Sequence, residues 1–66
     1  MFTAMLEIVA VRLYRDGLYT VPAEVLDDRG DEVLVRFAAG NIRFIESDQI
    51  SKATAADREE YLQALR

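Results

Sequence analysis

The chain has 66 residues, of which 52% are apolar, and its 12 acidic and 8 basic side chains give a net charge of −4. A chain this short forms one domain and buries only about 60% of the surface that its unfolded form exposes. It has no Cys and no His, which excludes disulfides and the commonest zinc sites. We therefore expect a single domain, residues 1–66, stabilised by its core or by homo-oligomerisation.

The acidic balance also limits the class of partner. Nucleic-acid binding depends on Lys and Arg side chains that neutralise phosphates, and Lys52 is the single lysine of the chain. The negative charge argues against nucleic acid and anionic membranes as partners, and it favours a basic protein. Since no apolar run approaches the ~20 residues of a membrane span, we expect a cytoplasmic protein.

Residues 6–14, Leu-Glu-Ile-Val-Ala-Val-Arg-Leu-Tyr, are rich in β-branched and aromatic side chains and contain no Gly or Pro. The turn signal Asp16-Gly17 follows them. The odd positions 9–13 are apolar and alternate with a mixed set at the even positions, which predicts a strand with one buried face. Residues 1–5 are ambiguous, because they could extend this strand, form a helical turn or pack against a second copy.

Three further strands are predicted, at residues 19–26, 32–37 and 41–46. Within the first of them Pro22 cannot donate a ladder hydrogen bond, so we expect a sheet edge or a bulge there. A polar turn at residues 27–31, which contains Gly30, and a turn at residues 38–41, which contains Gly40, separate the three strands. After the last strand, Ser47-Asp48-Gln49-Ile50 is typical of a helical turn that ends on a buried Ile50.

Residues 55–65 are mostly good helix formers. Thr54 followed by Asp57 has the spacing of an N-terminal capping box. Tyr61, Leu62 and Leu65 form a narrow apolar stripe that we expect to dock on one end of the strands, because a helix of a dozen residues is too short to be stable alone. Four short strands and a helix predict a small barrel or a meander.

Several of these segments resemble a Tudor domain of the SH3-like barrel superfamily, namely Asp16-Gly-Leu-Tyr-Thr-Val-Pro-Ala-Glu-Val25, Val33-Leu-Val-Arg-Phe37, Gly40-Asn41 and Ser47-Asp-Gln-Ile50. The match covers roughly residues 9–50. It implies a mostly β fold, an SH3-like or Tudor-like small barrel of four to five antiparallel strands with a C-terminal α-helix. The usual Gly-Asp turn before the first strand is absent here.

The resemblance also implies where a ligand would bind. Tudor domains that bind methylated Lys or Arg hold the cation in an aromatic cage. By position, Tyr14 and Phe37 would be cage aromatics and Asn41 the polar residue beside them. The two remaining cage positions fall on Val21 and Ala39. The resemblance therefore supports the fold better than it supports this ligand.

Two groups of side chains are candidates for partner binding. Tyr14, Tyr19 and Phe37, with Asn41, could line a shallow groove at one end of the barrel, although a domain this small also needs aromatic residues in its core. The second group is an acidic hairpin turn that could recognise a basic partner or could simply be solvated; its members are Asp27, Asp28, Asp31 and Glu32.

Catalysis and cofactor binding find little support in this sequence. Ser occurs only at positions 47 and 51, His and Cys are absent, and there is no Gly-rich phosphate loop. The acidic residues do not have the spacing of a calcium loop. Arg12, Arg36 and Arg43 fall on three predicted strands and are expected to form cross-strand ion pairs with Glu side chains. We predict no enzyme activity, no cofactor and no metal.

The leading hypothesis is a non-enzymatic adaptor that binds a protein or peptide through the aromatic end of the barrel. An alternative is a small acidic inhibitor or decoy from a mobile element, which would bind a basic nucleic-acid-binding protein. A third is a structural homo-oligomer joined through residues 1–8 and the helix stripe.

Overall fold

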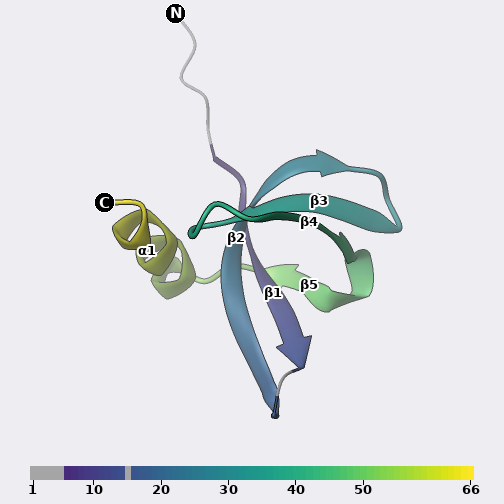
Figure 1. Ribbon diagram of the computed structural model, residues 1–66, viewed down its shortest axis with the longest axis horizontal. Coiled ribbons are helices and arrows are strands. Elements are labelled where there is room, and N and C mark those ends of the chain that lie inside the picture. The colour runs from purple at the N-terminus through teal and green to yellow at the C-terminus, as the bar shows by residue number, and fades with distance from the viewer. Residues whose placement is uncertain (1–5, 15) are drawn as a thin grey trace, which may run out of the picture.

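The structure is a computed structural model that describes residues 6–14 and 16–66, and it contains five strands, one short 3-10 helix and one α-helix (Figure 1). In chain order these elements are β1 (Ile8–Tyr14), β2 (Leu18–Asp28), β3 (Glu32–Phe37), β4 (Ile42–Glu46), η1 (Ser47–Gln49), β5 (Ile50–Lys52) and α1 (Ala55–Ala64). The strands form one antiparallel sheet in the order β4-β3-β2-β1-β5.

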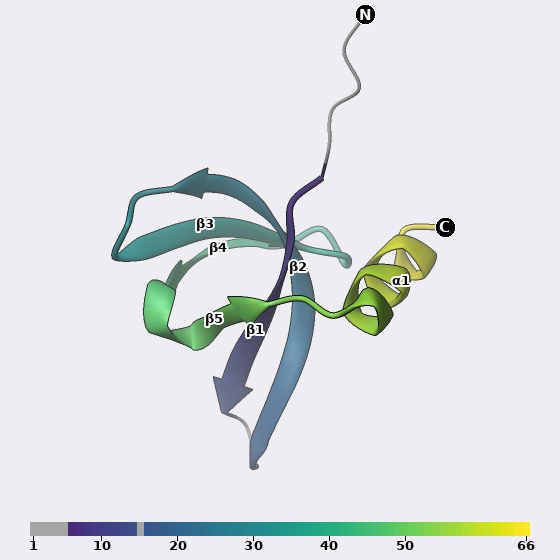
Figure 2. The same cartoon turned by 180° about the vertical axis from the view of Figure 1, so that it is seen from behind.

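The predicted mostly β fold with a C-terminal helix is confirmed, but the closed barrel is not. Among the described strands, β4 and β5 are the two edges of the sheet, and no pairing joins them. The three residues of η1 connect these edges, so the strands curl around the core and the sheet stays open, as the front and rear views show (Figures 1 and 2).

The length of β2 explains why the sheet curls. Its first half pairs with β1, from Leu18 to Glu24, and its second half pairs with β3, from Ala23 to Asp28. A register shift between Val25 and Asp27 marks a bulge, which bends a strand and increases its twist. Apolar side chains from four strands therefore meet in one core cluster, made of Val11, Ala23, Val33, Val35, Phe37 and Ile45.

Pro22 lies in a central strand and not at a sheet edge, contrary to the prediction, and the bulge lies three residues beyond it. Pro22 stands opposite Ala10 of β1, while the ladder between β2 and β3 begins one residue later, at Ala23. Because the ladder between β2 and β3 does not include Pro22, the missing N–H of this proline removes no hydrogen bond from that ladder.

Helix α1 packs against β1 and β2 on the face of the sheet opposite to the main core cluster (Figure 1). A second, smaller cluster of buried side chains lies beneath it and contains Ile8, Ala53 and Tyr61. The predicted capping box is present: Thr54 Oγ1 accepts from the Asp57 backbone N–H at 3.1 Å, and the Thr54 N–H donates to Asp57 Oδ2 at 2.9 Å.

The helix stripe docks only in part. Tyr61 is 1% exposed, whereas Leu62 and Leu65 are 45% and 51% exposed. Tyr61 is the one buried residue of α1, so the helix docks through this side chain and leaves the neighbouring Leu62 and Leu65 exposed. Because Ile8 and Ala10 are buried on the helix side, β1 has buried side chains on both faces and not on one face as predicted.

Element boundaries differ modestly from the predictions. β1 begins at Ile8 and not at residue 6, and β2 extends from Leu18 to Asp28, beyond the predicted 19–26. The predicted turn at residues 47–50 is η1, followed by a partly buried Ile50 that opens β5. The three alternatives for residues 1–5 lie outside the described residues.

Candidate functional site

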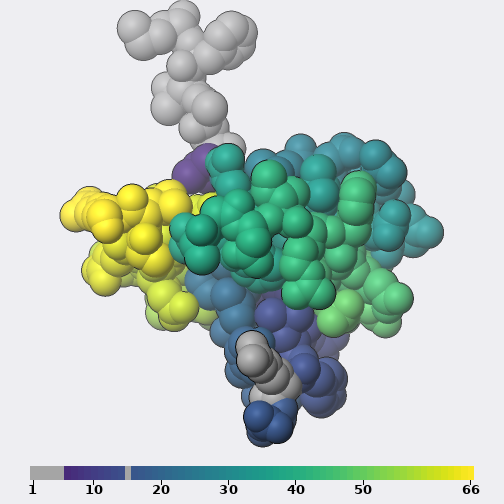
Figure 3. Space-filling view, in the orientation of Figure 1, coloured from purple at the N-terminus to yellow at the C-terminus, as the bar shows by residue number. Residues whose placement is uncertain are grey.

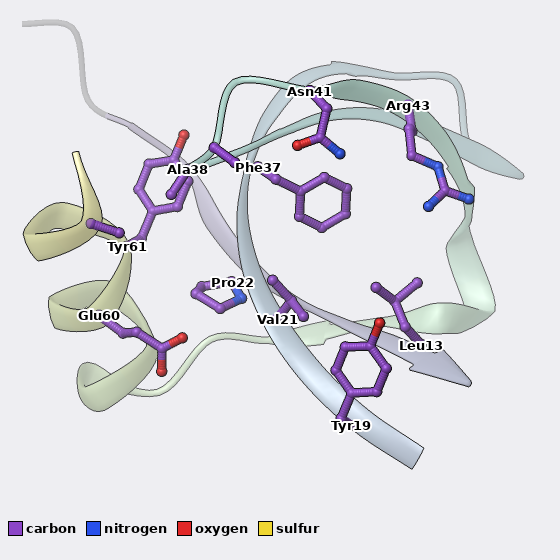
Figure 4. Close-up of a pocket in the computed structure, with 12 residues that line it drawn as sticks. Leu13, Tyr19, Val21, Pro22, Phe37, Ala38, Asn41, Arg43, Glu60 and Tyr61 are labelled. Atoms are coloured by element: carbon purple, nitrogen blue, oxygen red, sulfur yellow. The ribbon is translucent and has the colours of Figure 1, made fainter. Parts of the chain in front are cut away.

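An open groove of about 380 Å³ lies where the end of β1, the first half of β2, the turn between β3 and β4, and helix α1 meet (Figure 4). Its lining residues are Leu13, Tyr19, Val21, Pro22, Phe37, Ala38, Ala39, Asn41, Arg43, Glu60, Tyr61 and Ala64. In the space-filling view the β3–β4 turn stands beside the helix, and the paired ends of β1 and β2 project below them (Figure 3). The volume lies within the range of small-ligand pockets, about 300–1,000 Å³.

The floor of the groove is apolar and belongs to the core. Phe37 is only 7% exposed and packs in the main core cluster, so the groove reaches one surface of a core side chain. Leu13 and Val21 also pack against that cluster. Figure 4 shows the Phe37 ring projecting towards the middle of the groove, with Val21 below it. A ligand on this floor would contact aromatic and aliphatic surface held rigid by the sheet.

Polar side chains surround this floor on opposite walls. Asn41 and Arg43 descend from the β4 side, and Glu60 faces them from α1 (Figure 4). Tyr19, which is 40% exposed, stands at the lower end of the groove. The groove therefore combines an apolar floor with a polar rim.

The turn between β3 and β4 has a tight backbone that positions Asn41. The Phe37 N–H donates to the Asn41 carbonyl and the Gly40 N–H donates to the Phe37 carbonyl, both at 2.9 Å. Gly40 has φ +104°, a conformation that side chains with a Cβ rarely adopt. The predicted turn glycine therefore fixes Asn41 next to the Phe37 strand.

The helix wall is anchored through Tyr61. Its hydroxyl donates to the Arg36 carbonyl at 3.3 Å, and its ring is buried between helix and sheet. Arg36 in turn donates to Glu24 Oε1 at 2.6 Å. The hydrogen bond with the Glu24 carboxylate raises the pKa of the Arg36 guanidinium. Three elements, α1, β2 and β3, are thus held together behind the groove.

The structure brings three of the four residues proposed for the aromatic end together and places the fourth elsewhere. Tyr19, Phe37 and Asn41 line the groove. Tyr14 is 81% exposed and lies in a separate hollow with Arg12, Leu18, Asp48 and Gln49. The separation follows from strand alternation, because Tyr14 is on the face of β1 opposite to that of Leu13.

The acidic residues proposed for partner binding have different roles at the β2–β3 turn. Asp27 pairs with Arg29 at 3.3 Å, and the Arg29 guanidinium lies 4.8 Å from the centre of the Phe44 ring. Asp28 Oδ1 accepts from the Gly30 N–H at 2.9 Å, an interaction within the turn itself. The exposed Asp31 lines a surface hollow further along, together with Glu32, Glu46, Ser47 and Asp48.

The three strand arginines also differ from one another. Arg36 forms the expected cross-strand pair with Glu24. Arg12 instead donates to the backbone carbonyl of Asp48 in η1. In the part of the chain that the structure describes, the ion pairs are Asp27–Arg29 and Glu24–Arg36. Arg43 takes part in neither, and its side chain lines the groove.

Residues 6–14 and 16–66 were compared with the requirements of a metal-ligand cluster and of a membrane-spanning helix. No group of three or more His, Cys, Asp or Glu side chains there could hold a metal ion. Within the same residues no helix is both long and apolar enough to cross a membrane.

Comparison with protein-family models, with curated proteins and with solved structures gives no significant match. The chemistry of the groove and of the acidic surface therefore carries the functional argument.

Arg43 and Glu60 are charged groove residues that the sequence did not predict to bind a partner. The sequence predicted Arg43 only as a cross-strand ion-pair partner and assigned no role to Glu60. Strand alternation does place Arg43 on the same face as the buried Ile45. That signal was available, but the position of Glu60 depends on how the helix docks.

Proposed function

We propose that this protein is a non-enzymatic interaction module with an SH3-like small-barrel architecture, which binds a protein or peptide segment in the groove between the β3–β4 turn and α1. The observation that carries the proposal is the apolar floor of Phe37, Val21 and Leu13 bordered by polar side chains. Five antiparallel strands curled around one core, followed by a helix, support the proposed architecture.

The kind of groove favours an extended peptide segment over a cation held in an aromatic cage. A cage needs several ring faces around one point, and Tyr14 lies in a different hollow from Phe37. Val21 and Ala39, which occupy the two remaining cage positions, line the groove without supplying a ring. We therefore propose a Tudor-like architecture that binds a peptide segment and not a methylated side chain.

Selection from a random peptide library displayed on phage, followed by NMR titration of the selected peptides, tests this proposal. We expect the peptides to shift the backbone amides of Tyr19, Val21 and Asn41. Tyr19→Ala should weaken binding about tenfold or more, because a partly exposed aromatic residue at the rim supplies much contact area. The same substitution should leave the amide spectrum dispersed, since the side chain is 40% exposed.

Tyr14→Ala is the matched control, because it removes the same side chain from a strand position outside the groove. We expect it to leave the affinity unchanged. Equal losses in the two variants, or peptide-induced shifts confined to residues 12–18 and 48–49, would place the binding surface elsewhere and contradict the proposal.

A second candidate function rests on the acidic surface. Asp31, Glu32, Glu46 and Asp48 meet beside one hollow, because Glu32 and Glu46 are register partners and the Ser47 N–H donates to the Asp31 carbonyl. This clustering favours an acidic inhibitor or decoy for a basic protein. Charge-driven binding of that kind is sensitive to salt. Raising NaCl from 50 to 500 mM should abolish capture of a basic partner by this surface, whereas a peptide held on the apolar floor of the groove should lose much less affinity.

A further inference from the structure

The groove carries opposite charges on opposite walls. Arg43 is an exposed residue of β4 and Glu60 an exposed residue of α1, and both side chains line the groove across the apolar floor. Neither belongs to the two ion pairs of the described residues, Asp27–Arg29 and Glu24–Arg36. Both charges therefore face the space that a ligand would occupy.

We propose, building on the peptide-binding function above, that the groove selects a segment in which one apolar side chain is flanked by an acidic residue and a basic residue. The apolar side chain would lie on Phe37 and Val21. The ligand carboxylate would face Arg43, and the ligand cation would face Glu60. The partner is therefore recognised by mixed charge at this groove and not by positive charge alone.

Physical complementarity supports this choice of occupant. An Arg guanidinium binds a carboxylate through charge-assisted hydrogen bonds, and the Asn41 amide beside it can donate a further bond. A ligand with cations on both sides would place one of them against Arg43. A ligand with two carboxylates would place one against Glu60. Such contacts between like charges weaken the binding of the wrong ligand. The two charges therefore contribute more to specificity than to the affinity for the right ligand.

Four capped heptapeptides test the inference by NMR titration, each with a central Phe, a flanking residue two positions to either side of it and Gly elsewhere, because in an extended segment these side chains share the face of the Phe. The flanking residues are Glu and Lys (mixed), Lys and Lys (basic), Glu and Glu (acidic) or Gln and Gln (neutral). With the wild-type protein we expect the mixed peptide to bind about three- to tenfold more tightly than the neutral one, as one or two partly exposed ion pairs would produce.

Charge reversal makes the test specific to the two residues. Arg43→Glu should change the preference to the basic peptide, and Glu60→Arg should change it to the acidic peptide. The double variant should prefer the mixed peptide again, since a short peptide can bind in either direction. Arg58→Glu is the control, because it changes the net charge as Arg43→Glu does but lies beside Leu6 and Ile8, outside the groove.

The outcomes separate this inference from the proposed function. If all four peptides shift the groove amides with equal affinity, the charge selection is wrong and the peptide-binding function stands. If no peptide shifts the amides of Tyr19, Val21 or Asn41 at millimolar concentration, both are wrong. If Arg58→Glu changes the peptide preference as strongly as Arg43→Glu does, the effect comes from net charge alone and the inference is wrong.

Discussion

Glu24 of β2 and Arg36 of β3 lie directly opposite each other, and Arg36 Nη2 donates to Glu24 Oε1 at 2.6 Å. The Glu24 side chain is 11% exposed and that of Arg36 is 46% exposed. The pair lies on the face of the sheet that the helix covers, where Tyr61 binds the carbonyl of the same arginine. A polar network thus joins helix and sheet.

Glu24→Gln should destabilise the protein, because it removes the charge that Arg36 binds and leaves a largely buried polar group with a weaker partner. The pKa of Arg36 is raised in the folded state, so its contribution to stability is present below its unfolded-state pKa and is lost only at strongly alkaline pH. Urea unfolding of Glu24→Gln, Arg36→Gln and the double variant measures the coupling. Strictly additive losses would show that the two side chains do not interact.

Tyr61 is expected to account for most of the helix docking. Tyr61→Ala should cost about 3–5 kcal/mol, as for other large buried aromatic residues, which is of the order of the whole stability of so small a domain. Tyr61→Phe keeps the ring and loses only the hydrogen bond to the Arg36 carbonyl, so it should cost about 0.5–1.5 kcal/mol. Urea unfolding measures both changes.

Leu62→Ala is the control for Tyr61, because it removes an apolar side chain from the adjacent, 45% exposed position. A change within about 0.5 kcal/mol is expected there. A loss at Leu62 as large as that at Tyr61 would mean that the helix docks through a different face. Light scattering on the same variant would show whether Leu62 contributes to self-association.

The capping box of α1 should contribute measurably to stability. Thr54→Ala removes the acceptor for the Asp57 N–H and should cost about 1 kcal/mol, with a loss of helical signal in circular dichroism. Thr54→Ser retains the hydroxyl and should retain most of the stability. Equal losses in the two variants would attribute the effect to the threonine methyl group and not to the cap.

Two neighbouring acids of the β2–β3 turn should respond differently to the same charge change. Asp28→Ala removes a hydrogen bond to the Gly30 N–H and should cost about 1 kcal/mol. Asp27→Ala breaks an ion pair whose side chains are 53% and 59% exposed, and such pairs contribute little. Thermal unfolding of both variants makes the comparison. Equal effects would indicate that net charge, and not turn geometry, determines the stability of this hairpin.

Most of the secondary structure could be predicted from local pattern. Alternation along residues 32–37 placed Val33, Val35 and Phe37 on the buried face, because side chains on a strand alternate between its two faces. The capping box and the turn glycines were predicted for the same reason, since they depend on neighbours within a few residues. The three-residue strand β5 was not predicted separately, because its pairing with β1 spans some 40 residues of chain.

The groove could be predicted only in part. Tyr19, Phe37 and Asn41 were expected to lie together, and they do. Strand alternation was enough to place Tyr14 on the face of β1 opposite to Leu13 and Arg43 on the same face of β4 as Ile45, whereas the position of Glu60 could not be derived, because it depends on where the helix docks. The exposure of Leu62 and Leu65 has the same cause.

The sequence by itself determined the strands, the turns, the helix cap and the alternation that builds the core, because these follow from backbone preferences and apolar periodicity over short distances. The tertiary structure alone decided that the sheet stays open between β4 and β5, that Tyr61 docks without Leu62, and that Arg43 faces Glu60 across an apolar floor. These features depend on contacts between residues far apart in the chain, and no local pattern specifies the angle at which such elements meet.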